Sequence, residues 1–103
     1  MFTKLLKTIK HYGVRHQVKK LNEEHGEVVE AIYDLLYFKE NFLVTHEFLQ
    51  EDYDKLIDHV AEEIADNLNL LKQFQLLFDI PEKQINKWRE HKAERTIKEI
   101  KSK

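Results

Sequence analysis

Two acidic side chains, Glu63 and Asp66, occupy a stretch of helix where carboxylates are costly. Residues 53–78 carry apolar side chains at helical spacing, and at about 100° per residue Glu63 falls roughly 20° from Leu56 and Phe74. Asp66 lies about 60° from Glu63, at the margin of the apolar stripe. A carboxylate that faces a core is unfavourable unless it is paired or bound to a cation, so this pair indicates a function. The stripe expected to face inward comprises Leu56, Ile57, Val60, Ile64, Leu68, Leu71, Phe74 and Phe78.

A second carboxylate pair, Glu24 and Glu27, lies on an earlier helix. Relative to the apolar Leu21, Glu24 falls about 60° to one side and Glu27 about 120° to the same side. Each helix therefore offers two carboxylates, three residues apart, at or beside its buried edge. Four oxygen ligands from two facing helices predict a site for a hard divalent cation, Mg²⁺ or Mn²⁺. Asn67 lies on the same strip as Glu63 and could hydrogen-bond either a ligand or a core neighbour.

The elements that must position these residues are all helical. Apolar periodicity predicts helices over 2–12, 14–38, 52–78 and 81–100, ended or begun by Gly13 and by Pro81. Residues 39–52 are expected to form a connection, with a short extended piece at 41–45. The chain is therefore predicted to be one all-α domain over residues 1–103, a four-helix bundle. The fourth helix has a thin apolar face, so a homodimer or homotetramer is expected to complete the bundle.

Composition limits the class of protein. The 103 residues include two glycines, one proline and no cysteine, which suits a helical protein and excludes disulfides and thiolate metal sites. No apolar run is long enough to cross a bilayer, and the first residues do not resemble a signal peptide. We therefore expect no membrane partner, and a soluble protein of the cytoplasm.

Charge is strongly partitioned along the chain. Residues 1–22 carry six basic and no acidic side chains, residues 23–66 have a net charge of −12, and residues 67–103 have a net charge of +4. An acidic middle with basic ends fits a metal centre that has cations available for an anionic ligand. The same acidic middle argues against nucleic acid as the main partner.

Two motifs resemble a known family. The run from Glu23 to Glu27 fits EExxE, and the run from Glu63 to Asp66 fits ExxD. In this order, on two long helices of a small all-α protein, they resemble the MazG-like nucleoside triphosphate pyrophosphohydrolases, an all-α superfamily that also includes dimeric dUTPases. The resemblance covers residues 12–100. The sequence departs from the family pattern in a longer interval between the motifs and in Glu90, which replaces a usual asparagine.

The resemblance implies an activity and a set of site residues. It implies Mg²⁺-dependent hydrolysis of a (deoxy)nucleoside triphosphate to the monophosphate and pyrophosphate, with water attacking the α-phosphorus. The remaining substrate contacts that it implies are Gln17, near the base, and Lys92 and Arg95, near the phosphates. Tyr12 and Trp88 could stack on a base, although core packing is the preferred interpretation for each. The implied metal ligands, which also carry the catalysis, are Glu24, Glu27, Glu63 and Asp66.

Two other classes of function are distinguished by their sequence patterns. A di-iron carboxylate bundle needs a histidine three residues after a glutamate, and no histidine of this chain has that spacing. Apart from His25, which is expected to pack in the core, the histidines show no spacing typical of metal ligands. A non-catalytic helical interaction module, whose acidic cluster is structural or solvated, is the alternative from another class.

Overall fold

The computed structural model describes residues 1–45 and 50–102, with the side chains of 42–45 outside the description. Four α-helices account for nearly all of these residues, which contain no strand, so the all-α prediction is confirmed. The helices are α1 (Phe2–Tyr12), α2 (Val14–Thr45), α3 (Gln50–Leu77) and α4 (Glu82–Lys101). No helix within the described ranges has the length and apolar character needed to cross a membrane.

Helix α2 is longer than predicted. The connection expected from residue 39 and the extended piece at 41–45 were wrong, because the helix continues to Thr45. The added turns extend α2 beyond Phe38, whose ring lies 6.2 Å from that of Tyr53 on α3. The part of the expected connection at 46–49 lies outside the described residues.

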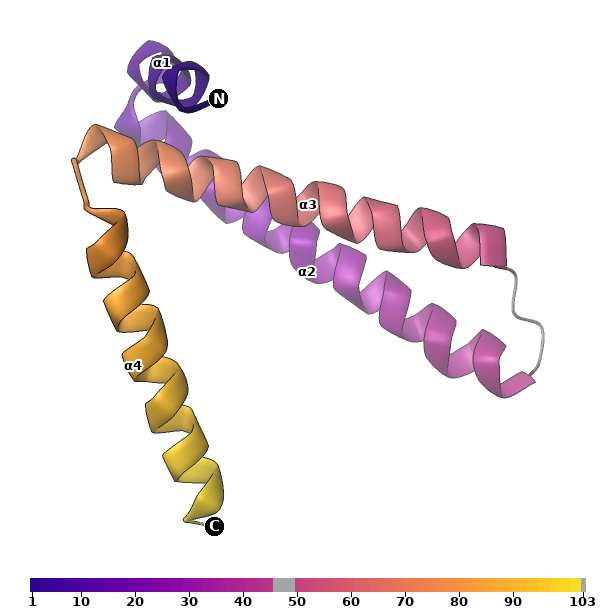
Figure 1. Cartoon of the computed structure of the whole chain (residues 1–103). Helices are drawn as coiled ribbons and strands as arrows, with labels where there is room; N and C mark the ends of the chain where they lie inside the picture. The colour runs from indigo at the N-terminus through magenta and orange to yellow at the C-terminus, as the bar shows by residue number, and fades with distance from the viewer. Residues whose placement is uncertain (46–49, 103) are drawn as a thin grey trace.

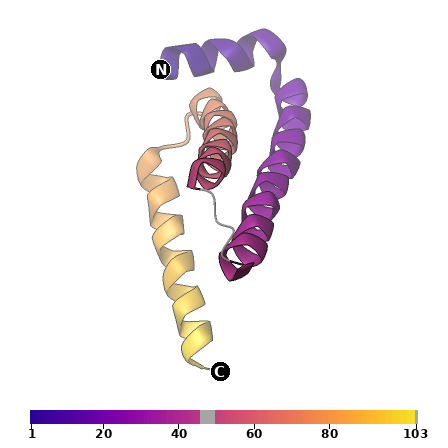
Figure 2. The ribbon, with the colours of Figure 1, turned by 90° about the vertical axis from the view of Figure 1, so that its right-hand side faces the viewer.

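Helices α2 and α3 form an antiparallel pair, with α1 lying across one end of it (Figures 1 and 2). Gln17 pairs with Gln73 near that end and Phe38 meets Tyr53 near the other, which fixes the register. A positive φ of 89° at Gly13 turns the chain from α1 into α2, a conformation that favours glycine. Helix α4 extends away and packs along none of the other three.

The contact between α2 and α3 follows a heptad pattern. On each helix the buried and half-buried positions recur at alternating intervals of three and four residues, the spacing of a coiled-coil seam. We call these positions the inner seams. The inner seam of α2 consists of Gln17, Leu21, Glu24, Val28, Ala31, Leu35 and Phe38. That of α3 consists of Leu56, Val60, Glu63, Asn67, Leu70, Phe74 and Leu77.

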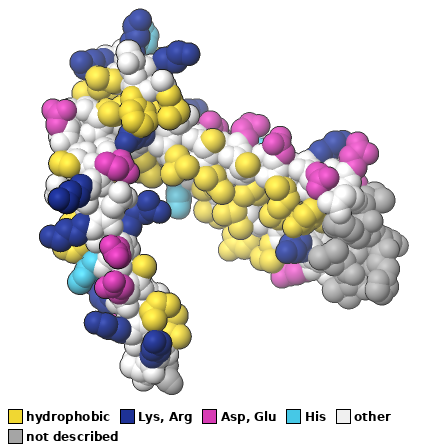
Figure 3. Space-filling view, viewed as in Figure 1, with side chains coloured by type: hydrophobic (Ala, Val, Ile, Leu, Met, Phe, Trp, Pro, Cys, Tyr) yellow, Lys and Arg dark blue, Asp and Glu magenta, His cyan; other side chains and the backbone are white. Residues whose placement is uncertain are grey.

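A second seam runs along α3, one residue later in register. It contains five of the residues predicted to face inward, and for these the prediction was wrong, since all five are exposed and Leu68 retains 60% of its surface. Figure 3 shows apolar side chains along this helix pair. We call the exposed rows the outer seams. That of α3 comprises Ile57, Ala61, Ile64, Leu68, Leu71, the half-buried Gln75 and Phe78, and the apolar part of that of α2 comprises Val18, Val29, Ile32 and Leu36.

The chain is extended for its size. Its radius of gyration is 17.8 Å, whereas a compact domain of this length has about 13 Å. Its accessible surface is 8537 Å², against roughly 6200 Å² for a compact monomer of this mass. The four helices of one chain therefore leave much apolar surface uncovered.

The junction between α3 and α4 is well defined. The amide of Ile80 donates to the carbonyl of Gln75 (2.9 Å) and that of Asp79 to Leu76 (3.4 Å), which is a Schellman ending. Lys72 and Gln75 both donate to the Glu82 carboxylate, at 2.9 and 2.8 Å. The hydrogen bond from Lys72 lowers the pKa of Glu82 from its ordinary value. These contacts fix the start of α4.

Asp79 occupies the left-handed position of this ending, with φ 53°. Glycine takes that conformation without a Cβ penalty. We expect Asp79→Gly to raise the free energy of unfolding by about 0.5–1 kcal/mol, measured by urea denaturation. Asp79→Ala, which keeps the Cβ, should give no gain; equal stabilisation by both variants would contradict the explanation.

Candidate metal centre and adjoining pocket

Helices α2 and α3 bring three of the four predicted metal ligands together. One carboxylate oxygen from each of Glu24, Glu63 and Asp66 lies within 4.8 Å of the other two. Glu24 and Glu63 occupy inner-seam positions and are only 6% and 7% exposed, whereas Asp66 is exposed. The cluster therefore has a buried side formed by two helices and an open side from which a ligand can enter.

One oxygen of each buried carboxylate lacks a hydrogen-bond partner. Oε2 of Glu24 and Oε2 of Glu63 are both inaccessible and bind no donor. Lys20 lies 3.2 Å from Oε1 of Glu24, and the hydrogen bond with Glu24 raises the pKa of Lys20. A single partly exposed lysine does not compensate two buried carboxylates and a third beside them. A divalent cation would satisfy the two orphan oxygens, so these residues fit a Mg²⁺ or Mn²⁺ ion.

Glu27, the fourth predicted ligand, lies beside Glu24. Its side chain is exposed. A hydrogen bond to Glu24, followed by the negative charge of Glu24, raises the pKa of Glu27, and Glu63 adds to the effect. The structure thus places Glu27 at the edge of the same negative field, although the close group of three does not include it.

Asn67 links the two helices below the carboxylates. Its amide nitrogen donates to the backbone carbonyls of Glu24 (3.0 Å) and Glu63 (2.8 Å). The sequence left open whether Asn67 bonds to a ligand or to a core neighbour. In the structure it bonds to core neighbours. Because both acceptors belong to the buried glutamates, Asn67 fixes the spacing between them.

A pocket of about 620 Å³ adjoins the cluster. Glu24 and Asp66 line one side of it, and residues of α1, α2 and α3 form the rest. Its volume falls within the range that small-molecule sites have. Besides the two carboxylates, its lining residues are Leu5, Thr8, Tyr12, His16, Gln17, Lys20, Glu23, Asn69, Leu70 and Gln73.

The floor of this pocket contains a buried amide pair. Gln17, a predicted substrate contact, donates from Nε2 to Oε1 of Gln73 at 2.8 Å, and both residues are buried. Nδ1 of His16 lies 2.7 Å from Oε1 of Gln17. The sequence did not predict a role for Gln73. The signal that could have indicated one is an uncharged polar residue next to the inner seam. The amides offer fixed polar groups beside an apolar wall.

The aromatic residues are placed differently from the sequence prediction. Tyr12 and Trp88 are exposed, so the expectation of core packing was wrong for both. The ring of Tyr12 stacks on that of His16 at 4.9 Å, and both line the pocket. Trp88 lies on α4, edge-on to His91. His25, expected in the core, is also exposed.

Lys92 and Arg95, the predicted phosphate contacts, lie on α4. Both are exposed, and neither lines the pocket beside Glu24 and Asp66. Since α4 packs along no other helix of the chain, the structure does not bring these residues to the carboxylates. Lys20 is the cation that lines this pocket.

The structure brings together a second group of possible metal ligands, which the sequence did not predict. His59, Glu62 and Glu63 also bring one ligand atom each within 4.8 Å of the others. The conclusion that the histidines have no ligand-like spacing was therefore wrong for His59, which precedes Glu63 by four residues. In this group the histidine precedes the glutamates, which is the reverse of the order in a Glu-x-x-His motif.

Comparison with known proteins gives no match: no protein-family model, no curated protein and no solved structure matches the chain. The family resemblance of the two motifs therefore stays a prediction, and the site is interpreted from its own geometry.

Glu63→Gln tests the unpaired charge. Without metal, the amide should raise the free energy of unfolding by about 1–2 kcal/mol, because it removes a buried charge that has no partner. With Mg²⁺ at a hundred times its Kd, the wild-type chain should gain about 2.7 kcal/mol, and the variant should gain much less. Thermal melts with and without Mg²⁺ measure both effects.

Glu30→Gln is the matched control, since Glu30 is exposed on α2. It should change neither the metal-free stability nor the gain with Mg²⁺. A Mg²⁺ gain that survives in Glu63→Gln would contradict the proposed metal centre.

Proposed function

We propose that the chain is a MazG-like nucleoside triphosphate pyrophosphohydrolase that uses Mg²⁺, with Mn²⁺ as an alternative ion. The observation that carries the proposal is the convergence of Glu24, Glu63 and Asp66, with two buried oxygens unsatisfied, at the mouth of a pocket. An uncompensated buried carboxylate pair is costly, and a hard divalent ion removes the cost. The pocket beside it provides room for the organic part of a substrate.

Each residue of the cluster has a proposed role. Glu24, Glu63 and Asp66 would hold the ion, with Glu27 at its edge as a further ligand or as a base for water. A divalent ion bound there neutralises phosphate charge and lowers the pKa of a bound water molecule. Lys20, beside Glu24, would donate a hydrogen bond to a phosphate oxygen. The proposed products are a nucleoside monophosphate and pyrophosphate.

The pocket supports a nucleoside as the remainder of the substrate. Tyr12 and His16 present stacked rings at the wall, and flat aromatic faces suit a planar base. The amides of Gln17 and Gln73 can donate to and accept from the edge of a base. Both amides are held by hydrogen bonds to neighbours, so they present a preorganised surface.

Product analysis tests the proposal. The purified chain with Mg²⁺ should release pyrophosphate and a monophosphate from at least one member of a panel of canonical and modified (deoxy)nucleoside triphosphates. We expect Glu63→Gln to lower kcat/KM by a factor of about 100 or more, since an ion ligand is lost.

Glu30→Gln, an exposed change on α2, serves as the control and should leave the rate unchanged. Release of orthophosphate would exclude cleavage at the α-phosphorus. Absence of hydrolysis across the panel, with Mg²⁺ binding intact, would favour the non-catalytic interaction module.

The proposed enzyme acts as a homo-oligomer, for which we favour a dimer. A helix with two apolar seams side by side is suited to two neighbours, as in a four-helix bundle. Within one chain, α3 has a helical partner along its inner seam, while its outer seam is exposed. The excess surface of about 2300 Å² over a compact monomer exceeds the roughly 800 Å² that each partner of a stable complex buries. Packing of two α2–α3 pairs would cover it.

Assembly would also bear on the basic residues of α4. Lys92 and Arg95 do not reach the pocket of their own chain. In the proposed dimer, α4 of the second copy is the source from which these cations could approach the phosphates. This would reconcile their predicted role with their position.

Ile64→Glu combined with Leu68→Glu tests the assembly. Two carboxylates in the outer seam of α3 should prevent apolar packing and raise the dimer dissociation constant by a factor of about 100 or more, equivalent to about 2.7 kcal/mol. Sedimentation velocity over a concentration series measures the change. Lys55→Glu, exposed on α3 outside both seams, should leave association unchanged, and a wild-type chain that stays monomeric would exclude the assembly.

A further inference from the structure

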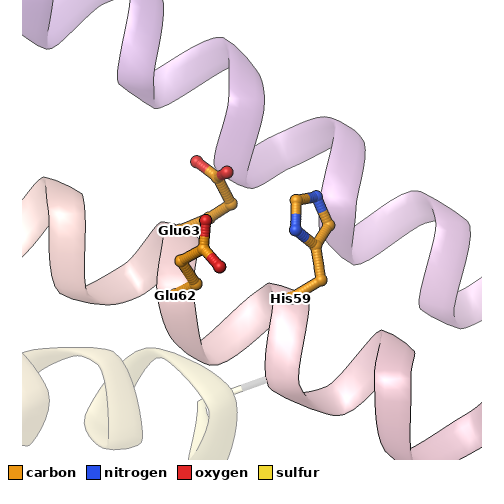
Figure 4. Close-up of side chains that lie close together, drawn as sticks. All are labelled: His59, Glu62 and Glu63. Atoms are coloured by element: carbon orange, nitrogen blue, oxygen red, sulfur yellow. The ribbon is translucent and has the colours of Figure 1, made fainter.

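His59, Glu62 and Glu63 form a compact group on consecutive turns of α3. Their ligand atoms lie within 4.8 Å of one another. Residues separated by three and four positions share one face of a helix, so these side chains converge without distortion of the backbone. Figure 4 shows the His59 ring and the Glu63 carboxylate directed to the same side, toward α2, with Glu62 beside them.

A second observation points to a cation at this group. Glu63 is 93% buried, since 7% of the residue's surface is exposed, and its Oε2 has no hydrogen-bond partner. Within the described residues, no lysine or arginine forms an ion pair with Glu62 or Glu63. The group therefore contains two carboxylates without a compensating cation and one imidazole that can act as a ligand.

Glu63 belongs to both groups of ligands, since it also meets Glu24 and Asp66. A carboxylate has two oxygens and can bind an ion with each of them. Pairs of ions that share ligands lie about 3.5–4 Å apart in known two-metal sites. The position of Glu63 between His59 on one turn and Asp66 on the next suits this bridging arrangement.

We propose that His59, Glu62 and Glu63 form a second divalent-cation site, which is bridged by Glu63 to the site of Glu24 and Asp66. The two sites differ in chemistry. The group with Asp66 supplies oxygen ligands alone, which suit Mg²⁺, whereas the imidazole favours first-row transition ions over Mg²⁺. The second site thus selects a transition ion such as Mn²⁺ or Zn²⁺. The inference depends on the cation role of Glu63 in the proposed function, but not on hydrolysis.

Mn²⁺ is the probe for the test, because it accepts both oxygen and nitrogen ligands. Titration of the full chain, followed by the electron paramagnetic resonance of free Mn²⁺, should give two ions per chain. Saturating Mg²⁺ should displace one of them and leave the other. Mn²⁺ should also broaden the imidazole proton signals of His59 in the NMR spectrum.

His59→Ala should weaken the Mn²⁺ that resists Mg²⁺ by at least about tenfold, the effect expected even for loss of an outer partner of a metal ligand. Asp66→Asn should weaken the other ion instead, and Glu63→Gln should weaken both. His91→Ala removes an exposed helical histidine that lies beside Trp88, and it should retain both ions. Since His59 is exposed, the variant should keep its far-UV circular dichroism.

Two results would overturn the inference: binding of one Mn²⁺ to the wild-type chain, or an unchanged stoichiometry in His59→Ala. The outcome is separable from that of the proposed function. Two His59-dependent ions without nucleotide hydrolysis would retain the second site and refute the enzyme. Hydrolysis with a single bound ion, whose affinity does not change in His59→Ala, would retain the enzyme and refute the second site.

Discussion

The burial of two like charges between α2 and α3 is the constraint on which the rest of the structure depends. Glu24 and Glu63 face each other from inner-seam positions where apolar residues would stabilise the helix pair. Apolar replacements of buried ionic groups are often neutral or favourable by about 1–4 kcal/mol. The arrangement is therefore unfavourable for the folded chain alone, and the proposed cation would offset that cost.

The scaffold holds these charges by dividing the helix pair into two ends. Toward α1 the seams contain polar layers, in which Gln17 bonds to Gln73 and Asn67 to the backbone of both helices. Toward the other end the layers are apolar and close on Phe38. The apolar end fixes the register, and the polar end uses that register to bring the carboxylates together. Asn67 keeps the helices from separating under the repulsion of the charges.

Sequence periodicity was sufficient to find the site but not its surroundings. Glu63 could be found because a carboxylate interrupts an apolar stripe, and Glu24 because its pair has the same spacing on the partner helix. The stripe of α3 was read as one face, whereas it is two seams one residue apart, and 100° per residue does not tell which seam the same chain covers. The end of α2 was misplaced because residues 39–45 lack a clean apolar period, although the helix continues through them. The direction in which α4 leaves α3 depends on the turn at Asp79, and the spacing of residues in the sequence does not predict that direction.

The proposed assembly follows from the same constraint as the proposed metal centre. Four of the fourteen inner-seam residues, Gln17, Glu24, Glu63 and Asn67, are polar, and Ala31 adds little area. The contact between α2 and α3 therefore buries less apolar surface than its length suggests, and burial is the main source of stability. The outer seam of α3 is apolar at six of its seven positions, Gln75 being the exception. In the proposed assembly, apolar burial along the outer seams supplies the free energy that the charged inner seams lack. In these proposals, a chain whose internal contact holds a metal centre would gain stability from association, so the two proposals have one physical origin.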